Sequence, residues 1–140
     1  MSSNPVNPVL SKRLRSMLQA STCLDALALV SMDGLEIASA IPPEVNGARM
    51  AAMTLATFTL GEQIANDLER YKLQEVYVKG QDGYIVLMPL KTKAVLIALS
   101  REGAKIGLML LEMHRVAAEL LRPLPPTSPH ASKSTPARQK

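Results

Sequence analysis

Two Asp-Gly dipeptides, each lying between two apolar runs, constrain the fold of this chain more than any other feature. They are Asp33-Gly34 and Asp82-Gly83. An Asp-Gly pair between apolar runs favours a tight hairpin, because glycine readily adopts the positive φ that such turns require. A fifth apolar run follows the second hairpin, so the sequence predicts an antiparallel sheet. The five predicted strands are residues 24–31, 35–40, 73–79, 84–90 and 94–99.

Three segments with helical spacing of apolar residues alternate with these strands. Asn7 and Pro8 supply the first helix with an N-cap and a first-turn proline. Ser100 is the expected N-cap of the last helix, and Gly107 in its first turn predicts close packing of that helix on the sheet. The order is helix, two strands, long helix, three strands, helix. The chain is therefore predicted to belong to the α+β class.

The long helix, expected over residues 46–70, is apolar on nearly every side, and residues 50–61 include no charged side chain. One stripe begins at Met50 and continues to Tyr71. A helix that is apolar all round must be covered on both sides. The sheet can cover one side, but little chain is left for the other, so we expect a second copy of the protein there. The face opposite the stripe contains Ala48, Ala52, Leu55, Ala56 and Thr59.

The net charge of +4 comes from the ends of the chain rather than from its centre. Residues 1–15 and 123–140 each carry three cations and no acid, whereas residues 16–122 carry 10 Lys and Arg against 12 Asp and Glu. A nucleic-acid-binding domain should carry its cations on the folded surface, so no nucleic-acid partner is expected. Contact of the basic ends with acidic lipid or an acidic partner stays open.

The division of the chain follows from composition. Residues 123–140 hold half of the ten prolines and no apolar stripe, so we expect a disordered basic tail that does not contribute to the fold. Residues 1–7 are also expected to be disordered, which leaves residues 8–122 as one domain. Aromatic residues make up only 3% of the chain, which disfavours an aromatic-lined ligand pocket.

Few residues in this sequence suit catalysis. Cys23 is the only cysteine and is expected to be buried beside the first strand, and the histidines are His114 and His130. One histidine within the predicted domain makes neither a metal site nor a Ser-His-Asp triad. Asp33 and Asp82 are each the first residue of an Asp-Gly turn, which accounts for their presence without a catalytic role. We therefore expect no catalytic, cofactor-binding or metal-binding residues, and we do not expect an enzyme.

The sequence also predicts where the protein resides. No uncharged apolar run reaches the ~18 residues that a membrane span requires, so stable membrane insertion is not expected. The first residues lack the basic-then-apolar pattern of a signal peptide. These two observations predict a cytoplasmic protein.

Three segments stand in an order and spacing that match a known family. They are the hairpin ALVSMDGLEIA (residues 28–38), the Met- and Ala-rich start of the long helix, and AKIGLM (residues 104–109). In these segments the chain resembles the Roadblock/LC7 domain family, over residues 9–121, and most of all its prokaryotic MglB-type regulators of Ras-like GTPases. The resemblance implies a roadblock/profilin-like fold: a five-stranded antiparallel sheet, with the long helix on one face and the two terminal helices on the other.

The resemblance also implies an assembly. The family dimerises by packing the long helices together and pairing the third strands edge to edge. Transferred to this chain, that arrangement predicts a homodimer whose interface contains Ala48, Ala52, Leu55, Ala56, Thr59, Val76, Tyr77 and Val78.

The function implied by the resemblance is that of a non-catalytic partner protein. The most similar members bind a Ras-like small GTPase as a homodimer and accelerate its hydrolysis of GTP by reshaping the catalytic loops of the GTPase. Other members are scaffolds or adaptors that recruit partners without affecting nucleotide turnover, and both alternatives stay open. Arg49 and Arg70 are better explained as solvated helix ends than as arginine fingers. The candidate partner-binding residues are Arg49, Glu62, Gln63 and Asn66.

Overall fold

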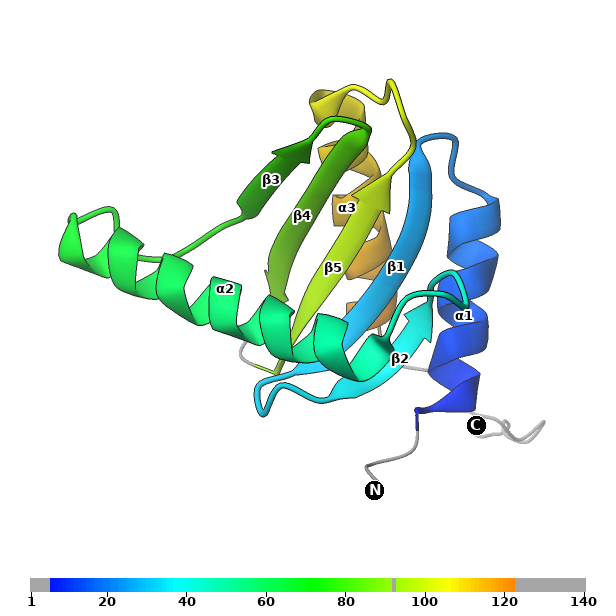
Figure 1. The fold of residues 1–140 in the computed structure, drawn as a ribbon, viewed down its shortest axis with the longest axis horizontal. Helices are drawn as coiled ribbons and strands as arrows, with labels where there is room; N and C mark the ends of the chain where they lie inside the picture. The colour runs from blue at the N-terminus through cyan, green and yellow to red at the C-terminus, as the bar shows by residue number, and fades with distance from the viewer. Residues whose placement is uncertain (1–5, 92, 123–140) are drawn as a thin grey trace, which may run out of the picture.

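The structure, a computed structural model, describes residues 6–91 and 93–122. The tail that was predicted to be disordered, residues 123–140, lies outside the described residues, as do residues 1–5. Figure 1 shows helices and strands in the predicted order, which confirms the α+β class. They are α1 (Pro8–Gln19), β1 (Leu24–Ser31), β2 (Glu36–Ala40), α2 (Gly47–Asp67), β3 (Val76–Gly80), β4 (Gly83–Leu90), β5 (Ala94–Ser100) and α3 (Ile106–Leu121).

The five strands form one antiparallel sheet in the order β2-β1-β5-β4-β3. The hairpins β1–β2 and β3–β4 are joined through β5, which pairs with β1 on one side and with β4 on the other. The two edge strands of the sheet are therefore β2 and β3. The central strand β5 is apolar on both faces because both faces are covered by helices.

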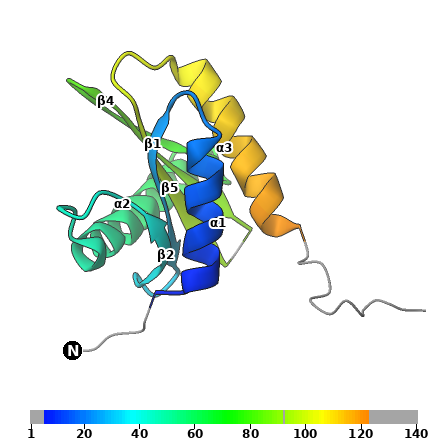
Figure 2. The same cartoon turned by 90° about the vertical axis from the view of Figure 1, so that its right-hand side faces the viewer.

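The helices cover the sheet unequally. Helix α2 lies on one face, here called the front, and α1 and α3 lie together on the other, the rear (Figures 1 and 2). The front core contains Phe58 of α2 packed with residues such as Val95 and Leu87 of the sheet. The rear core is larger, and its fully buried side chains include Leu14, Leu24, Leu27, Leu96, Met109 and Met113.

The turn of the second hairpin lies one residue earlier than predicted. Gly80 pairs with Gly83, so Gln81 and Asp82 form the turn. Gly83 begins β4 with a φ of +151°, and a Cβ at this position would lie 2.9 Å from the Ser100 Oγ. Glycine is required here by the close approach of the end of β5 rather than by the turn itself.

The predicted start of the last helix is wrong. Ser100 is the last residue of β5, where its buried hydroxyl accepts a hydrogen bond from the Tyr84 N–H (2.8 Å) and donates one to the Arg101 carbonyl (3.1 Å). Helix α3 begins after Lys105 instead. A Cβ at Gly107 would meet no atom within 4 Å, so this glycine does not serve close packing on the sheet.

Candidate protein-binding surfaces around helix α2

Helix α2 rests on the sheet with only part of its length. Asn46 caps it by accepting a hydrogen bond from the Arg49 N–H (3.0 Å), and the helix then crosses β2, β1 and β5. At Gly61 the helix lies close to the edge of the sheet, since a Cβ there would lie 3.2 Å from the side chains of both Leu73 and Val76, the first residue of β3. The remaining turns extend past the β3 edge (Figure 1). We call residues 62–67 the overhang.

The side of α2 that faces the sheet lies between the two faces that the sequence singled out. Its buried residues are Met50, Ala51, Thr54 and Phe58, of which only Met50 belongs to the predicted stripe. Thr54 tolerates burial because its hydroxyl lies 3.8 Å from the Met50 sulfur, a weak acceptor. Both predicted faces are therefore open in one copy of the chain. Five residues of the predicted stripe are between 53% and 65% exposed: Met53, Leu60, Ile64, Leu68 and Tyr71.

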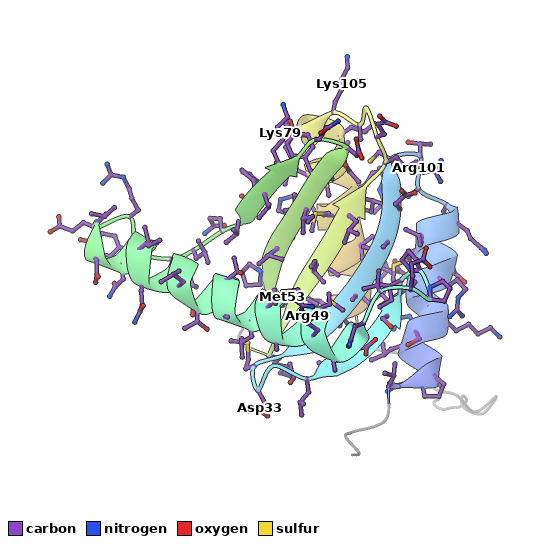
Figure 3. The ribbon with its side chains drawn as sticks, viewed as in Figure 1. Asp33, Arg49, Met53, Lys79, Arg101 and Lys105 are labelled. Carbon is purple, nitrogen blue, oxygen red and sulfur yellow. The ribbon has the colours of Figure 1, made fainter. Side chains whose placement is uncertain are left out.

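One open side of α2, here called the groove flank, looks onto the uncovered part of the front of the sheet. A mostly apolar groove of about 470 Å³, here called the front groove, lies between them. Met53 comes from the first half of α2, where Figure 3 also labels Arg49. The groove is lined on its two sides by Met53, Thr57, Val78, Ile85, Leu87 and Leu99.

The other open side, the hairpin flank, faces the turn between β1 and β2. A shallow groove of about 530 Å³ lies there, between the small side chains of α2 and the turn. A Cβ on Gly34 would lie 3.4 Å from Leu55, which shows how closely the turn approaches the helix. This flank contains Ala52, Leu55, Ala56, Thr59 and Gln63, opposite Asp33 and Gly34.

The structure separates two groups of residues that the sequence assigned to one interface. Ala52, Leu55, Ala56 and Thr59 lie on the hairpin flank. Val78 lines the groove on the opposite flank, and it is 43% exposed on an edge strand. The other two β3 residues of the predicted interface are Val76 and Tyr77.

The candidate partner-binding residues are also divided. Glu62, Gln63 and Asn66 line a groove of about 1080 Å³ beside the overhang, together with residues such as Tyr71 and Lys72. Arg49 lies apart from them, in the wall of the front groove. The structure thus brings three of the four predicted residues together.

Strand β3 presents an open edge, since it pairs only with β4 within the described residues. Just before it, the Glu75 carboxylate accepts a hydrogen bond from the Tyr77 hydroxyl (3.0 Å) and lies 3.5 Å from the His114 Nε2 of α3. Burial, followed by the neighbouring Glu75, raises the pKa of Tyr77. These contacts fix the start of β3 to the rear layer.

One polar cluster was missed by the sequence analysis. The Glu112 carboxylate of α3 accepts hydrogen bonds from Ser21, Thr22 (3.2 Å) and the Cys23 thiol (3.2 Å), which ties α3 to the start of β1. Burial raises the pKa of Glu112, but the hydrogen bonds outweigh it, so that the pKa lies below 4.5. Burial and Glu112 raise the pKa of Cys23 to about 11, which makes this buried thiol unreactive at neutral pH. The cluster is structural.

Neither a metal-binding cluster nor a membrane-spanning helix occurs among the described residues. Within ranges 6–91 and 93–122, no three His, Cys, Asp or Glu side chains lie close enough together to hold a metal ion. In the same ranges, no helix has both the length and the apolar character needed to cross a bilayer. Open apolar surfaces around α2, suited to protein–protein contact, are the distinctive feature of this part of the chain.

The fold defines the class of protein: a roadblock/profilin-like α+β domain. It superimposes on MglB of Myxococcus xanthus with a TM-score of 0.68 at 17% identity, covering 80% of this chain and 89% of that one. A Roadblock/LC7 domain from Streptomyces avermitilis gives a TM-score of 0.71 at 16% identity, covering 79% and 92%. Profilin from Schizosaccharomyces pombe gives 0.61 at 16% identity, covering 79% and 95%.

Sequence similarity assigns the chain to a particular family within this fold class. Residues 12–100 match the Roadblock/LC7 domain, and the chain belongs to this family. The uncharacterized protein MJ1340 of Methanocaldococcus jannaschii is 29% identical over 92 residues, which are 66% of this chain and 80% of that protein.

Proposed function

We propose that this protein is a non-catalytic, cytoplasmic homodimer that binds a Ras-like small GTPase and accelerates its hydrolysis of GTP. The observation that carries the proposal is that α2 has two open apolar flanks in addition to the side that packs on the sheet. One flank is suited to a second copy of the chain. The other stays available for a different partner.

The dimer proposal begins with the β3 edge. If β3 of two copies pairs in antiparallel fashion, a twofold axis perpendicular to the sheet relates the copies, and both front faces lie on the same side. The overhang of each copy extends past β3 (Figure 1), and in the proposed arrangement it lies over the front groove of the other copy. Ile64, on the groove flank and 53% exposed, becomes buried in this arrangement.

The hairpin flank supports the GTPase part of the proposal. In the proposed dimer this flank points away from the partner copy, and its Ala52 and Ala56 permit close approach of another protein backbone. Gln63 lines both this groove and the one beside the overhang, so the polar residues Glu62 and Asn66 adjoin the apolar surface. An apolar centre with a polar rim is the usual composition of a protein interface. The resemblance to MglB-type regulators suggests that the partner is a Ras-like GTPase.

The proposal assigns the chemistry to the GTPase. The protein would act by binding and reshaping the catalytic loops of its partner rather than by inserting an arginine. Arg49 lies on the groove flank, away from the proposed binding surface, and the Arg70 guanidinium donates to the Leu68 carbonyl (3.3 Å) at the end of α2. Neither position suits an arginine finger directed from the hairpin flank.

The experiment is a measurement of phosphate release by a purified Ras-like GTPase from the same genome, with and without this protein. We expect faster hydrolysis with the wild type. Ala56→Asp should abolish the acceleration while the protein stays dimeric, because it places a charge on the hairpin flank. Binding without acceleration would support a scaffold instead, and absence of binding would contradict both functions.

A further inference from the structure

The outer surface of the rear layer combines cations with exposed apolar side chains. On α1, Val9 is 63% exposed and lies on the same helix as the exposed Lys12 and Arg15. On α3, Leu108 and Leu111 are 44% and 56% exposed, and Arg115 follows one turn later. We call this set the rear surface. It consists of Val9, Lys12, Arg15, Leu108, Leu111 and Arg115.

The carboxylates of the same two helices are engaged elsewhere. Glu112 accepts hydrogen bonds from residues 21–23, and the Glu119 carboxylate lies 3.4 Å from Arg122. Within residues 6–91 and 93–122, by contrast, no carboxylate lies within 4.0 Å of the charged groups of Lys12, Arg15 or Arg115. The rear surface therefore presents cations that the described part of the chain does not neutralise.

The front layer has the opposite charge. Helix α2 carries two carboxylates and one arginine, whereas α1 and α3 together carry four Lys and Arg against two carboxylates. The domain is polarised, with α2 on the acidic side and α1 and α3 on the basic side (Figure 2). An extended anionic surface would orient the domain with its rear layer inward and α2 facing away.

We propose that the rear surface holds the protein on the surface of a membrane containing anionic phospholipids. Exposed leucines along one amphipathic helix, with cations beside them, are the features by which helices lie in the interface of an anionic bilayer. Leu108 and Leu111 do not line the two grooves between α1 and α3, whereas Arg115 lines one of them and Val9 and Lys12 line the other. A flat lipid surface fits the two exposed leucines better than a protein segment that needs a groove.

The proposed dimer would strengthen this contact. The twofold axis described above places the rear surfaces of both copies on the same side, so that two surfaces meet one membrane at once. Residues 123–140, which carry three cations and no acid, add positive charge to that of the rear surface. The rear surface by itself still distinguishes anionic from neutral lipid.

The test is sedimentation of the full chain with vesicles of phosphatidylcholine alone, or with part of it replaced by phosphatidylserine. We expect binding to the anionic vesicles only, weakened by added salt. Lys12→Glu combined with Arg115→Glu should weaken that binding about tenfold or more. Lys91→Glu combined with Lys93→Glu is the matched control, because it makes the same charge change in the β4–β5 turn and should weaken binding much less.

Two results would overturn the proposal. One is equal sedimentation with neutral and anionic vesicles, or none with either. The other is that both double variants weaken vesicle binding equally. Binding would then depend on the net charge of the chain, including residues 123–140, and not on the rear surface. Circular dichroism of both variants checks that they are folded, so that loss of binding reports on the surface itself.

Discussion

The two faces of the sheet are covered in different ways. On the rear, α1 and α3 together cover the sheet and bury a core in which Leu14, Met109 and Met113 are 0% exposed. On the front, α2 covers β1, β2 and β5, leaves a groove over β4 and β5, and carries its last turns past the edge of the sheet. The rear layer is complete in one copy of the chain, whereas the front layer is not.

This difference separates stability from assembly. Apolar area that is already buried stabilises the single chain, and apolar area that stays exposed can contribute only when a partner arrives. The rear core should therefore dominate the unfolding free energy. The groove flank and overhang of α2 should instead determine the oligomeric state.

The largest expected effect follows from truncation of the rear core. Met113→Ala should lower the free energy of unfolding by about 2–5 kcal/mol, because it leaves a cavity in a fully buried site. Met53→Ala, made in a monomeric Ile64→Asp background, should change it by less than about 0.5 kcal/mol, since Met53 is 53% exposed there. Urea unfolding of both variants measures the contrast. Equal losses would show that the groove flank is part of the single-chain core.

The next largest effect concerns association. Ile64→Asp would bury an unpaired carboxylate in the proposed interface, which costs several kcal/mol, so the variant should be monomeric at micromolar concentration. Its unfolding as a monomer should show a normal cooperative transition, since Ile64 is exposed in the single chain. Ala56→Asp, on the hairpin flank, is the matched control and should stay dimeric. Light scattering distinguishes the two, and the reverse outcome would place the dimer contact on the hairpin flank.

A smaller effect is expected at the end of α2. Glu69 follows the helix with a φ of 59°, a left-handed conformation that favours glycine. Glu69→Gly should therefore raise the free energy of unfolding by about 1 kcal/mol at most. Thermal unfolding of the variant measures this. A clear decrease would mean that the Glu69 side chain makes a contact that outweighs the conformational cost.

The smallest effect is pH-dependent. The pKa of Glu112 is lowered below 4.5 in the folded protein, so its contribution to stability is complete above 4.5 and is lost as the pH falls through the folded value. Glu112→Gln should thus be less stable than the wild type at neutral pH, and the difference should shrink in acid. Unfolding free energies at several pH values test this, and a difference that grows in acid would contradict it.

Local signals account for the part of the fold that sequence could predict. Asp33-Gly34 and the run before it predicted the first hairpin, because turn chemistry and strand alternation are both encoded within about ten residues. The Asn7 cap is confirmed, with its side chain accepting hydrogen bonds from the Val9 and Leu10 N–H groups. These features depend on neighbours along the chain.

Features that depend on distant contacts were not predictable. The sheet-facing side of α2 could not be chosen by hydrophobicity when every side of the helix is apolar, and buried Thr54 would have argued against the correct side. The Glu112 cluster joins residues about 90 positions apart. Ser100 was misassigned because its partner, the Tyr84 N–H, belongs to the neighbouring strand.

The central claim, that the open front of one chain is completed by a second copy, is tested most directly by the mass of the wild-type protein in solution. Sedimentation equilibrium at micromolar concentration should give twice the chain mass of 15.1 kDa, with no monomer detectable. A mass of 15.1 kDa under these conditions would contradict the account, because no second copy would then cover the front groove and the overhang of α2.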